Sequence, residues 1–245
     1  MAIGSLHKYT SRGIVLSTVK YGEKGLIVHL LTSAYGRQSY MVQGLGSRGG
    51  RGKQALFQPM FALEFEGVRS SRMQMHRFAD VHSGLVLQSI PFDVRKSTIA
   101  MFMAEVLHRL VKESEANERL FDFVWGSVEA LDAMQEGVAN FHLWFFAHLC
   151  RLLGFSPGNE YSEGCWFDIA EGLFCPEQPL TEFRLTPDNA LLLRDMLECD
   201  VRYLAEIGLN RRQRVDFLSS LVAYYGYHLD TVASIRSIDI LQEVF

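Results

Sequence analysis

The period of the apolar residues changes once along the chain, near Pro91, and this change constrains the fold more than any other feature. Before it, five runs rich in Val, Ile, Leu, Tyr and Phe, separated by polar or glycine-containing turns, predict β-strands. The predicted strands cover residues 11–21, 25–32, 36–43, 57–68 and 73–82. Five short strands suit a small closed or half-closed barrel, because closure removes exposed sheet edges.

After Pro91 the apolar residues follow the spacing of α-helices. One helix face is formed by Ile99, Phe102, Met103, Val106, Leu107 and Leu110. Two more helices follow. The second of them, residues 140–155, is apolar on nearly all sides, which predicts the central helix of a bundle. Thr186 and Pro187 suit a helix start, and another helix is predicted from Asn210 to His228.

These patterns predict a multi-domain α+β protein. The first domain, residues 1–82, is expected to be a five-stranded OB-fold, the commonest barrel of this kind. The second, residues 83–245, is expected to be all-α, with a long irregular loop at about 156–181 that contains one hairpin.

The two halves of the chain differ in charge. Residues 1–80 have 11 Lys and Arg against 4 Asp and Glu, whereas residues 81–245 have 13 against 24. A basic domain joined to an acidic one predicts a polyanionic partner for the first domain.

Residues 44–54, GLGSRGGRGKQ, form the most basic segment and are called the basic loop below. They include five glycines, three cations and no acid. The segment matches G-x-G-x-x-G, but the further glycines and Pro59 argue against a following helix, and no acid stands about twenty residues on. A P-loop is also excluded, because Gln54 stands where that motif requires Ser or Thr.

Nucleic-acid binding by the barrel fits the loop and its surroundings, because glycines let a backbone approach phosphates and cations neutralise them. Tyrosines near the loop offer stacking faces for bases. The candidate binding residues are Lys20, Lys24, Arg37, Tyr40, Arg48, Arg51, Lys53, Arg69, Arg72 and Arg77, and Tyr21 and Tyr35 are further stacking candidates. The alternative, in which the loop is a solvated tether, stays open.

No residues are nominated for catalysis, for a cofactor or for a metal. Glu105 and His108 form a single E-x-x-H, whereas a di-iron bundle needs two. Cys165 and Cys175 flank one loop, but two ligands do not complete a structural zinc site. The chain has no G-x-S-x-G motif, and no apolar run long enough for a signal peptide or a membrane span. It is therefore expected to be a non-enzymatic, cytoplasmic protein with reduced cysteines.

Residues 13–60 resemble the N-terminal domain of the RecO recombination mediators. The resemblance rests on the Tyr21-Gly22-Glu23 turn, the basic loop and Phe57-Gln58-Pro59. It implies an OB-fold that binds single- and double-stranded DNA, RecR as a partner, and contact with the acidic tail of single-strand-binding protein. It also implies strand annealing and RecA loading in the RecF pathway of DNA repair, in the cytoplasm at the nucleoid.

In one respect the chain departs from that family. Many RecO proteins have two C-x-x-C pairs, and only Cys165 and Cys175 stand in the corresponding loop here. The zinc site is therefore expected to be degenerate or lost, with Trp166, Phe167, Leu173 and Phe174 holding the loop by packing. From another functional class, a protein-interaction adaptor whose basic barrel binds an acidic protein remains an alternative.

Overall fold

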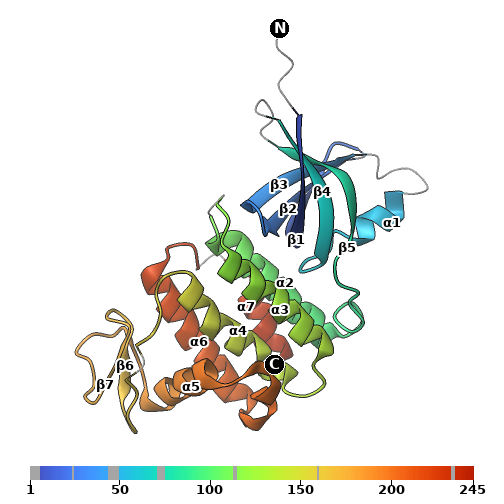
Figure 1. The fold of residues 1–245 in the computed structure, drawn as a ribbon. Helices are drawn as coiled ribbons and strands as arrows, with labels where there is room; N and C mark the ends of the chain where they lie inside the picture. Colours follow the sequence, from blue (N-terminus) through green and yellow to red (C-terminus); the bar gives the residue numbers. More distant parts are fainter. Residues whose placement is uncertain are drawn as a thin grey trace. The chain divides into compact units, whose positions relative to one another are not determined.

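The computed structural model describes residues 6–23, 25–43, 50–70, 75–112, 115–158, 160–232 and 235–245 (Figure 1). Contacts divide the chain into two compact units. The barrel unit is Met1–Phe92 with Val111–Glu129, and the helical unit is Asp93–Leu110 with Ala130–Phe245. Each unit is described separately.

The barrel unit contains a closed five-stranded sheet in the order β1-β2-β3-β5-β4. Its strands are β1 (Leu6–Tyr21), β2 (Gly25–Thr32), β3 (Gly36–Gln43), β4 (Ala62–Ser70) and β5 (His76–Ser83). The 16-residue β1 pairs with β4 through its first half and with β2 through its second, and a bulge between Val15 and Ser17 separates the two. The predicted OB-fold is therefore confirmed.

Three strand starts differ from the prediction, and one of them is that of β5, which begins at His76 rather than at residue 73. β1 begins at Leu6 rather than at residue 11, because Leu6 to Arg12 pair with β4, more than fifty residues later in the chain. β4 begins at Ala62 rather than at residue 57. The segment before it turns inward, so that Phe57 is 3% exposed in the core and the Met60 amide donates to the Val15 carbonyl at 2.7 Å.

A short helix, α1 (Gly50–Ala55), connects β3 to β4 in the chain and lies outside the barrel (Figure 1). The glycines of this segment predicted a loop, because glycine disfavours helices, and that prediction is wrong for Gly50–Ala55. The helix does not restore the dinucleotide-binding motif, which belongs to a βαβ unit of a parallel sheet, whereas β3 continues into a closed barrel.

The barrel core follows the alternation of the strands. Val28 and Tyr40 are fully buried, whereas their neighbours Ile27, Ser39 and Met41 are partly exposed on the outer surface. Phe78 stacks on Tyr40 with the ring centroids 4.6 Å apart, and Phe57 also stacks on Phe78, with the ring centroids 5.7 Å apart. Aromatic packing therefore fills much of the interior.

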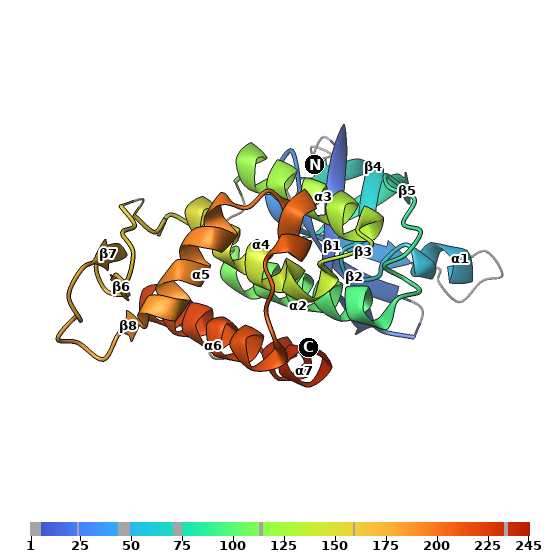
Figure 2. The ribbon, with the colours of Figure 1, turned by 90° about the horizontal axis from the view of Figure 1, so that it is seen from below.

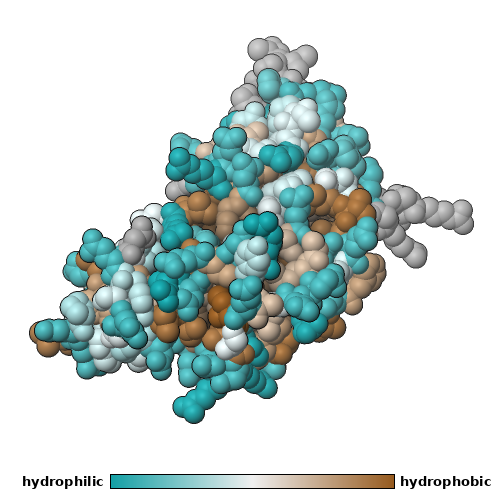
Figure 3. All heavy atoms as spheres, turned by 60° about the horizontal axis from the view of Figure 1, so that its bottom comes forward, coloured by the Kyte–Doolittle hydropathy of each residue, from teal (hydrophilic) through white to brown (hydrophobic). Residues whose placement is uncertain are grey.

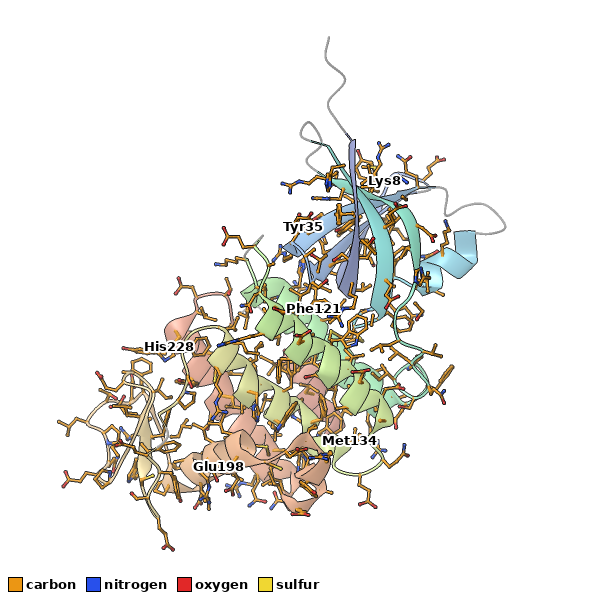
Figure 4. All side chains as sticks on the ribbon, viewed as in Figure 1. Lys8, Tyr35, Phe121, Met134, Glu198 and His228 are labelled. Atoms are coloured by element: carbon orange, nitrogen blue, oxygen red, sulfur yellow. The ribbon has the colours of Figure 1, made fainter. Side chains whose placement is uncertain are left out.

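The first turns of α3 (Glu118–Ala133) belong to the barrel unit, together with the segment before them. The guanidinium of Arg12 lies 5.1 Å from the ring centroids of both Phe121, which is labelled in Figure 4, and Trp125. Arg37 Nη1 donates to the Val111 carbonyl at 2.9 Å. These contacts attach the start of α3 to β1 and β3.

The helical unit is built around α4 (Val138–Leu152), which contacts four other elements (Figure 2). They are α2 (Val94–Leu110), α5 (Pro187–Glu198), the 3₁₀ helix η1 (Val201–Glu206) and α6 (Arg211–His228). Most of α4 is buried, as predicted for the central helix. Among the described residues, no helix has the length and apolar character that a bilayer span requires.

The predicted starts of α5 and α6 are confirmed by their caps. Thr186 Oγ1 accepts a bond from the Asn189 amide, and Asn210 forms a capping box with Gln213. Two short elements, η1 and α7 (Ser237–Val244), were not predicted from the sequence. The α7 start is held by Glu105 of α2, whose carboxylate accepts from the Ser237 amide at 2.9 Å. Glu105 is therefore a helix cap rather than a free surface acid.

The predicted loop with one hairpin is a small sheet in the order β7-β6-β8. Its strands are β6 (Trp166–Asp168), β7 (Leu173–Cys175) and β8 (Arg184–Leu185). Phe167 is fully buried, 5.0 Å from the ring of Phe174 and 5.4 Å from that of Tyr224. Packing by Phe167 and Phe174 is as expected, whereas Leu173 is 52% exposed and does not serve this purpose.

Candidate nucleic-acid interface

One side of the barrel surface is acidic. The pairing register places Glu66 beside Asp80 on the outer side of β4 and β5, and Glu64 lies two residues before Glu66 on the same side. Lys8 Nζ, from β1, lies 3.3 Å from a Glu66 carboxylate oxygen (Lys8 is labelled in Figure 4). A groove of about 550 Å³ runs over these acids. This surface, the acidic face, repels a polyanion.

The opposite side of the barrel, the basic face, is formed by the outer surfaces of β2 and β3 with α1 and the adjoining ends of β1 and β5. The sequence has no Asp or Glu between Glu23, in the β1–β2 turn, and Glu64. β2, β3 and α1 therefore contain no acid at all. The positive charge of the barrel is concentrated here.

Three predicted cations are exposed on the barrel unit. Lys20 stands at the end of β1, Lys53 is on α1, and Arg77 pairs with Met41 where β5 meets β3. Arg77 points outward with Met41. Lys20, in contrast, pairs with the buried Leu26 and so lies at the end of the barrel, on the side of the groove that Gln54 of α1 lines. All three are exposed, and none of the ion pairs formed within the described part of the chain uses them. α1 is adjacent to the strand ends, since Gln54 and Leu26 line one groove of about 440 Å³.

Apolar side chains form a row on the outer side of the barrel that ends at Arg77. The register places Val19, Ile27, Met41 and Arg77 in one outward row on neighbouring strands. Val19 is 52% exposed, and Tyr21, two residues further along β1, is 51% exposed. An apolar strip with a tyrosine, edged by cations, can contact unpaired bases and phosphates together.

The other predicted residues lie elsewhere or are not described. Arg37 is partly buried and binds the Val111 carbonyl. Arg69 is exposed at the end of β4, with its guanidinium 5.7 Å from the ring centroid of Tyr35. Lys24, Arg48 and Arg72 lie outside the described residues, as does the side chain of Arg51.

The prediction that Tyr40 stacks on a base is wrong. Tyr40 is 0% exposed inside the barrel, where burial and its hydrogen bond with Tyr9 raise the pKa of its hydroxyl. The hydroxyls of Tyr9 and Tyr40 are 2.8 Å apart, and the Tyr9 hydroxyl is 2.9 Å from His76 Nδ1. Tyr40 therefore belongs to an internal polar network.

Sequence reasoning missed Ile27 and Met41 as surface residues of the candidate site, although the alternation in β3 does place Met41 on the same side as Ser39. It also missed the role of Tyr9 and His76, for which the sequence has no signal, since they are 67 residues apart.

On the helical unit, one groove has a volume of about 440 Å³ and includes Ala133, Met134, Val201 and Arg202 in its lining. Hydrophobic and hydrophilic side chains are intermixed on the face of the molecule in Figure 3. Over the described residues, no three His, Cys, Asp or Glu side chains are arranged to hold a metal ion. Cys165 is buried and Cys175 is partly exposed, and neither is in a disulfide.

Comparison with known families matches both parts of the chain. Residues 6–89 match the model of the recombination protein O N terminal domain, and residues 91–233 match that of the C terminal domain. The chain is 35% identical to the DNA repair protein RecO of Flavobacterium psychrophilum over 236 residues, which are 96% of this chain and 98% of that protein.

Two other relatives, also named DNA repair protein RecO, align over nearly their full lengths. The Bacteroides fragilis protein is 34% identical over 235 residues, 95% of this chain and 97% of that protein. The Phocaeicola vulgatus protein is 33% identical over 234 residues, again 95% and 97%. With both domain models matched in order and full-length relatives above 30% identity, the chain belongs to the RecO family.

Proposed function

We propose that this chain acts in DNA repair as a recombination mediator and that it binds DNA through the basic face of its barrel. The observation that carries the proposal is the separation of charge on the barrel. Exposed Lys20, Lys53 and Arg77 lie around β2, β3 and α1, which contain no acid, while Glu64, Glu66 and Asp80 lie on the outer side of β4 and β5. Names of the relatives support the repair role.

Binding at this face is expected to depend little on sequence. Cations at its edges neutralise phosphates and release counterions, a contribution that every sequence provides. Exposed Val19 and Tyr21 offer apolar and aromatic contacts that any base can use. The acidic face disfavours binding on the far side, so the strand is held in one position. The proposal involves binding and positioning, without a chemical step.

The division of labour follows the predicted domains. We propose that the barrel, residues 1–82, binds single- and double-stranded DNA, and that residues 83–245 contact protein partners. Resemblance to the family supports RecR and the acidic tail of single-strand-binding protein as those partners, with strand annealing and RecA loading as the outcome. The net charge of residues 81–245, with 13 cations against 24 acids, fits a domain that does not itself hold a polyanion.

A fluorescence-anisotropy titration tests DNA binding directly. A labelled single-stranded oligonucleotide of random sequence is titrated with the full chain at several salt concentrations. We expect the logarithm of affinity to fall linearly with the logarithm of salt. The triple variant Lys20→Ala, Lys53→Ala, Arg77→Ala should make this plot shallower by about 2 units, because each lost phosphate contact removes about 0.7 for a single strand.

A matched control removes three exposed arginines from the helical unit, Arg151, Arg202 and Arg212. It changes the net charge equally and should leave the salt slope unchanged. If both triple variants lower the slope alike, binding follows net charge and the basic face is not the site. If the parent binds no DNA at any salt concentration, the adaptor function replaces this proposal.

A further inference from the structure

The barrel is closed by a very short seam between β3 and β5. Among the described residues two pairs form it, Tyr40 with His76 and Met41 with Arg77, in parallel orientation. By comparison, β1 and β4 pair continuously from Leu6 with Ser70 to Ile14 with Ala62. A ladder of two pairs supplies few backbone hydrogen bonds, so the start of β5 is held by its pairing with β4, where Arg77 faces Val68, and on the β3 side by side-chain contacts.

Those contacts come from the internal polar network. The Tyr9 hydroxyl, on β1, bonds to the Tyr40 hydroxyl on one side of the seam and to His76 Nδ1 on the other, at 2.8 and 2.9 Å. His76 is 8% exposed, and burial, with the nearby charge of Arg69, lowers the pKa of its imidazole. Tyr9 thus joins both edges of the seam from inside the barrel.

A glycine of β4 provides the space that the Tyr9 ring occupies inside the barrel. Gly67 of β4 faces Tyr9 in the pairing register. A Cβ atom on Gly67 would lie 2.5 Å from Cζ of the Tyr9 ring, closer than any van der Waals contact allows. Glycine at this position therefore lets the Tyr9 ring enter the barrel and reach the seam.

The seam also decides where Arg77 points. Strand alternation places His76 inward and Arg77 outward onto the basic face, beside Met41. Across the described residues, no hydrogen bond or ion pair of the Arg77 side chain orients it. Its direction is therefore set by the backbone of the first two residues of β5, which the network holds through His76.

We infer that His76 is a positioning residue for DNA binding. Its hydrogen bond to Tyr9, which also bonds to Tyr40, fixes the start of β5 so that Arg77 presents its charge to the nucleic acid on the basic face. These two hydrogen bonds are called the clasp below. This inference rests on the proposed function. A cation whose backbone is already ordered loses less conformational freedom on binding, so releasing the clasp weakens affinity without removing a charge.

The deciding variant is Tyr9→Phe, which removes the bridging hydroxyl and keeps the ring that fills the core. We expect it to bind a single-stranded oligonucleotide about three- to tenfold more weakly, the order of one hydrogen bond between neutral groups. Hydrogen exchange should show faster exchange at the start of β5, while cooperative thermal unfolding shows that the barrel remains folded. His76→Leu should weaken binding similarly, and His76→Asn, which keeps a polar atom near the place of Nδ1, should restore much of it.

A double-mutant cycle separates positioning from general destabilisation. If the clasp acts through Arg77, then Tyr9→Phe should have little further effect on binding in an Arg77→Ala background. In a Lys53→Ala background it should keep its full effect, because Lys53 is on α1 and away from the seam. A structural role alone would give the same loss in both backgrounds.

Several outcomes overturn the inference. Parent-like DNA binding by Tyr9→Phe would do so, as would equal losses in the two backgrounds. If Arg77→Ala, Lys20→Ala and Lys53→Ala all bind like the parent, the basic face itself is wrong and the inference falls with it. If these cation variants weaken binding and Tyr9→Phe does not, the proposed function stands and only the clasp is refuted.

Discussion

Acid should destabilise the helical unit through two buried histidines on α4. His142 is 1% exposed, with its ring stacked on Phe245 at 5.3 Å, and burial together with Arg214 lowers its pKa to about 3. His148 lies 2.9 Å from the Met196 carbonyl, and burial lowers its pKa to about 4. Both imidazoles are therefore neutral in the folded chain well below the usual pKa of 6.5.

The sign follows from proton uptake. Below pH 6.5 the unfolded chain binds a proton at each histidine, whereas the folded chain does not until the pH approaches the lowered pKa. The stability that depends on these two neutral histidines is therefore fully present above pH 6.5 and is lost as the pH falls towards about 4. Each histidine removes about 1.4 kcal/mol per pH unit, so the step from pH 7 to pH 5 costs about 2 kcal/mol for each, or about 4 kcal/mol in total.

Urea unfolding followed by circular dichroism at pH 7 and pH 5 measures this loss. We expect His142→Leu to lose about 2 kcal/mol less than the parent between the two pH values. It should also be no less stable at pH 7, because His142 Nδ1 is buried and has no hydrogen-bond partner among the described residues. His7→Leu, at an exposed position on β1, is the control and should follow the parent. Identical pH dependence in His142→Leu and the parent would refute the assignment of His142 as a buried neutral group.

Three further predictions concern other regions of the chain. Changing the three cations of the basic loop to alanine should make the salt plot for single-strand binding shallower by about 2 units with little change in stability; parent-like binding at every salt concentration would identify the loop as a solvated tether. Glu105→Ala should lower the unfolding free energy in urea by about 1–2 kcal/mol, because the first amides of α7 lose their acceptor, whereas exposed Glu243→Ala should change it little. Metal analysis of untagged protein prepared without added zinc should find well under one zinc per chain, and a stoichiometric content would show that Cys165 and Cys175 have further ligands.

Much of the fold was predictable because it depends on local patterns. β2 and β3 have the predicted bounds, since glycine turns delimit them and apolar residues alternate within them. The helices α4, α5 and α6 follow from periodicity and from caps at Thr186 and Asn210, which act within one turn. The family resemblance needed no more than the motifs of the barrel domain.

Errors arose where distant contacts decide the structure. The first half of β1 is polar and was not predicted as strand, because it becomes a strand by pairing with β4. Tyr40 was placed in the DNA site because cations surround it in sequence, but closure of the barrel turns its side of β3 inward. Glu105 looks like a surface acid until α7 folds back to its carboxylate.

The sequence by itself determined the excess of cations in the barrel and the absence of acids from Glu23 to Glu64, because these are properties of composition. Only the tertiary structure decided that Glu64, Glu66 and Asp80 lie on the outer side of β4 and β5 and that Lys20, Lys53 and Arg77 are exposed around β2, β3 and α1. Alternation along a strand gives two sides, but it does not say which side closes around the core. That choice is made when five strands, joined at a seam of two residue pairs, bury their apolar side against one another.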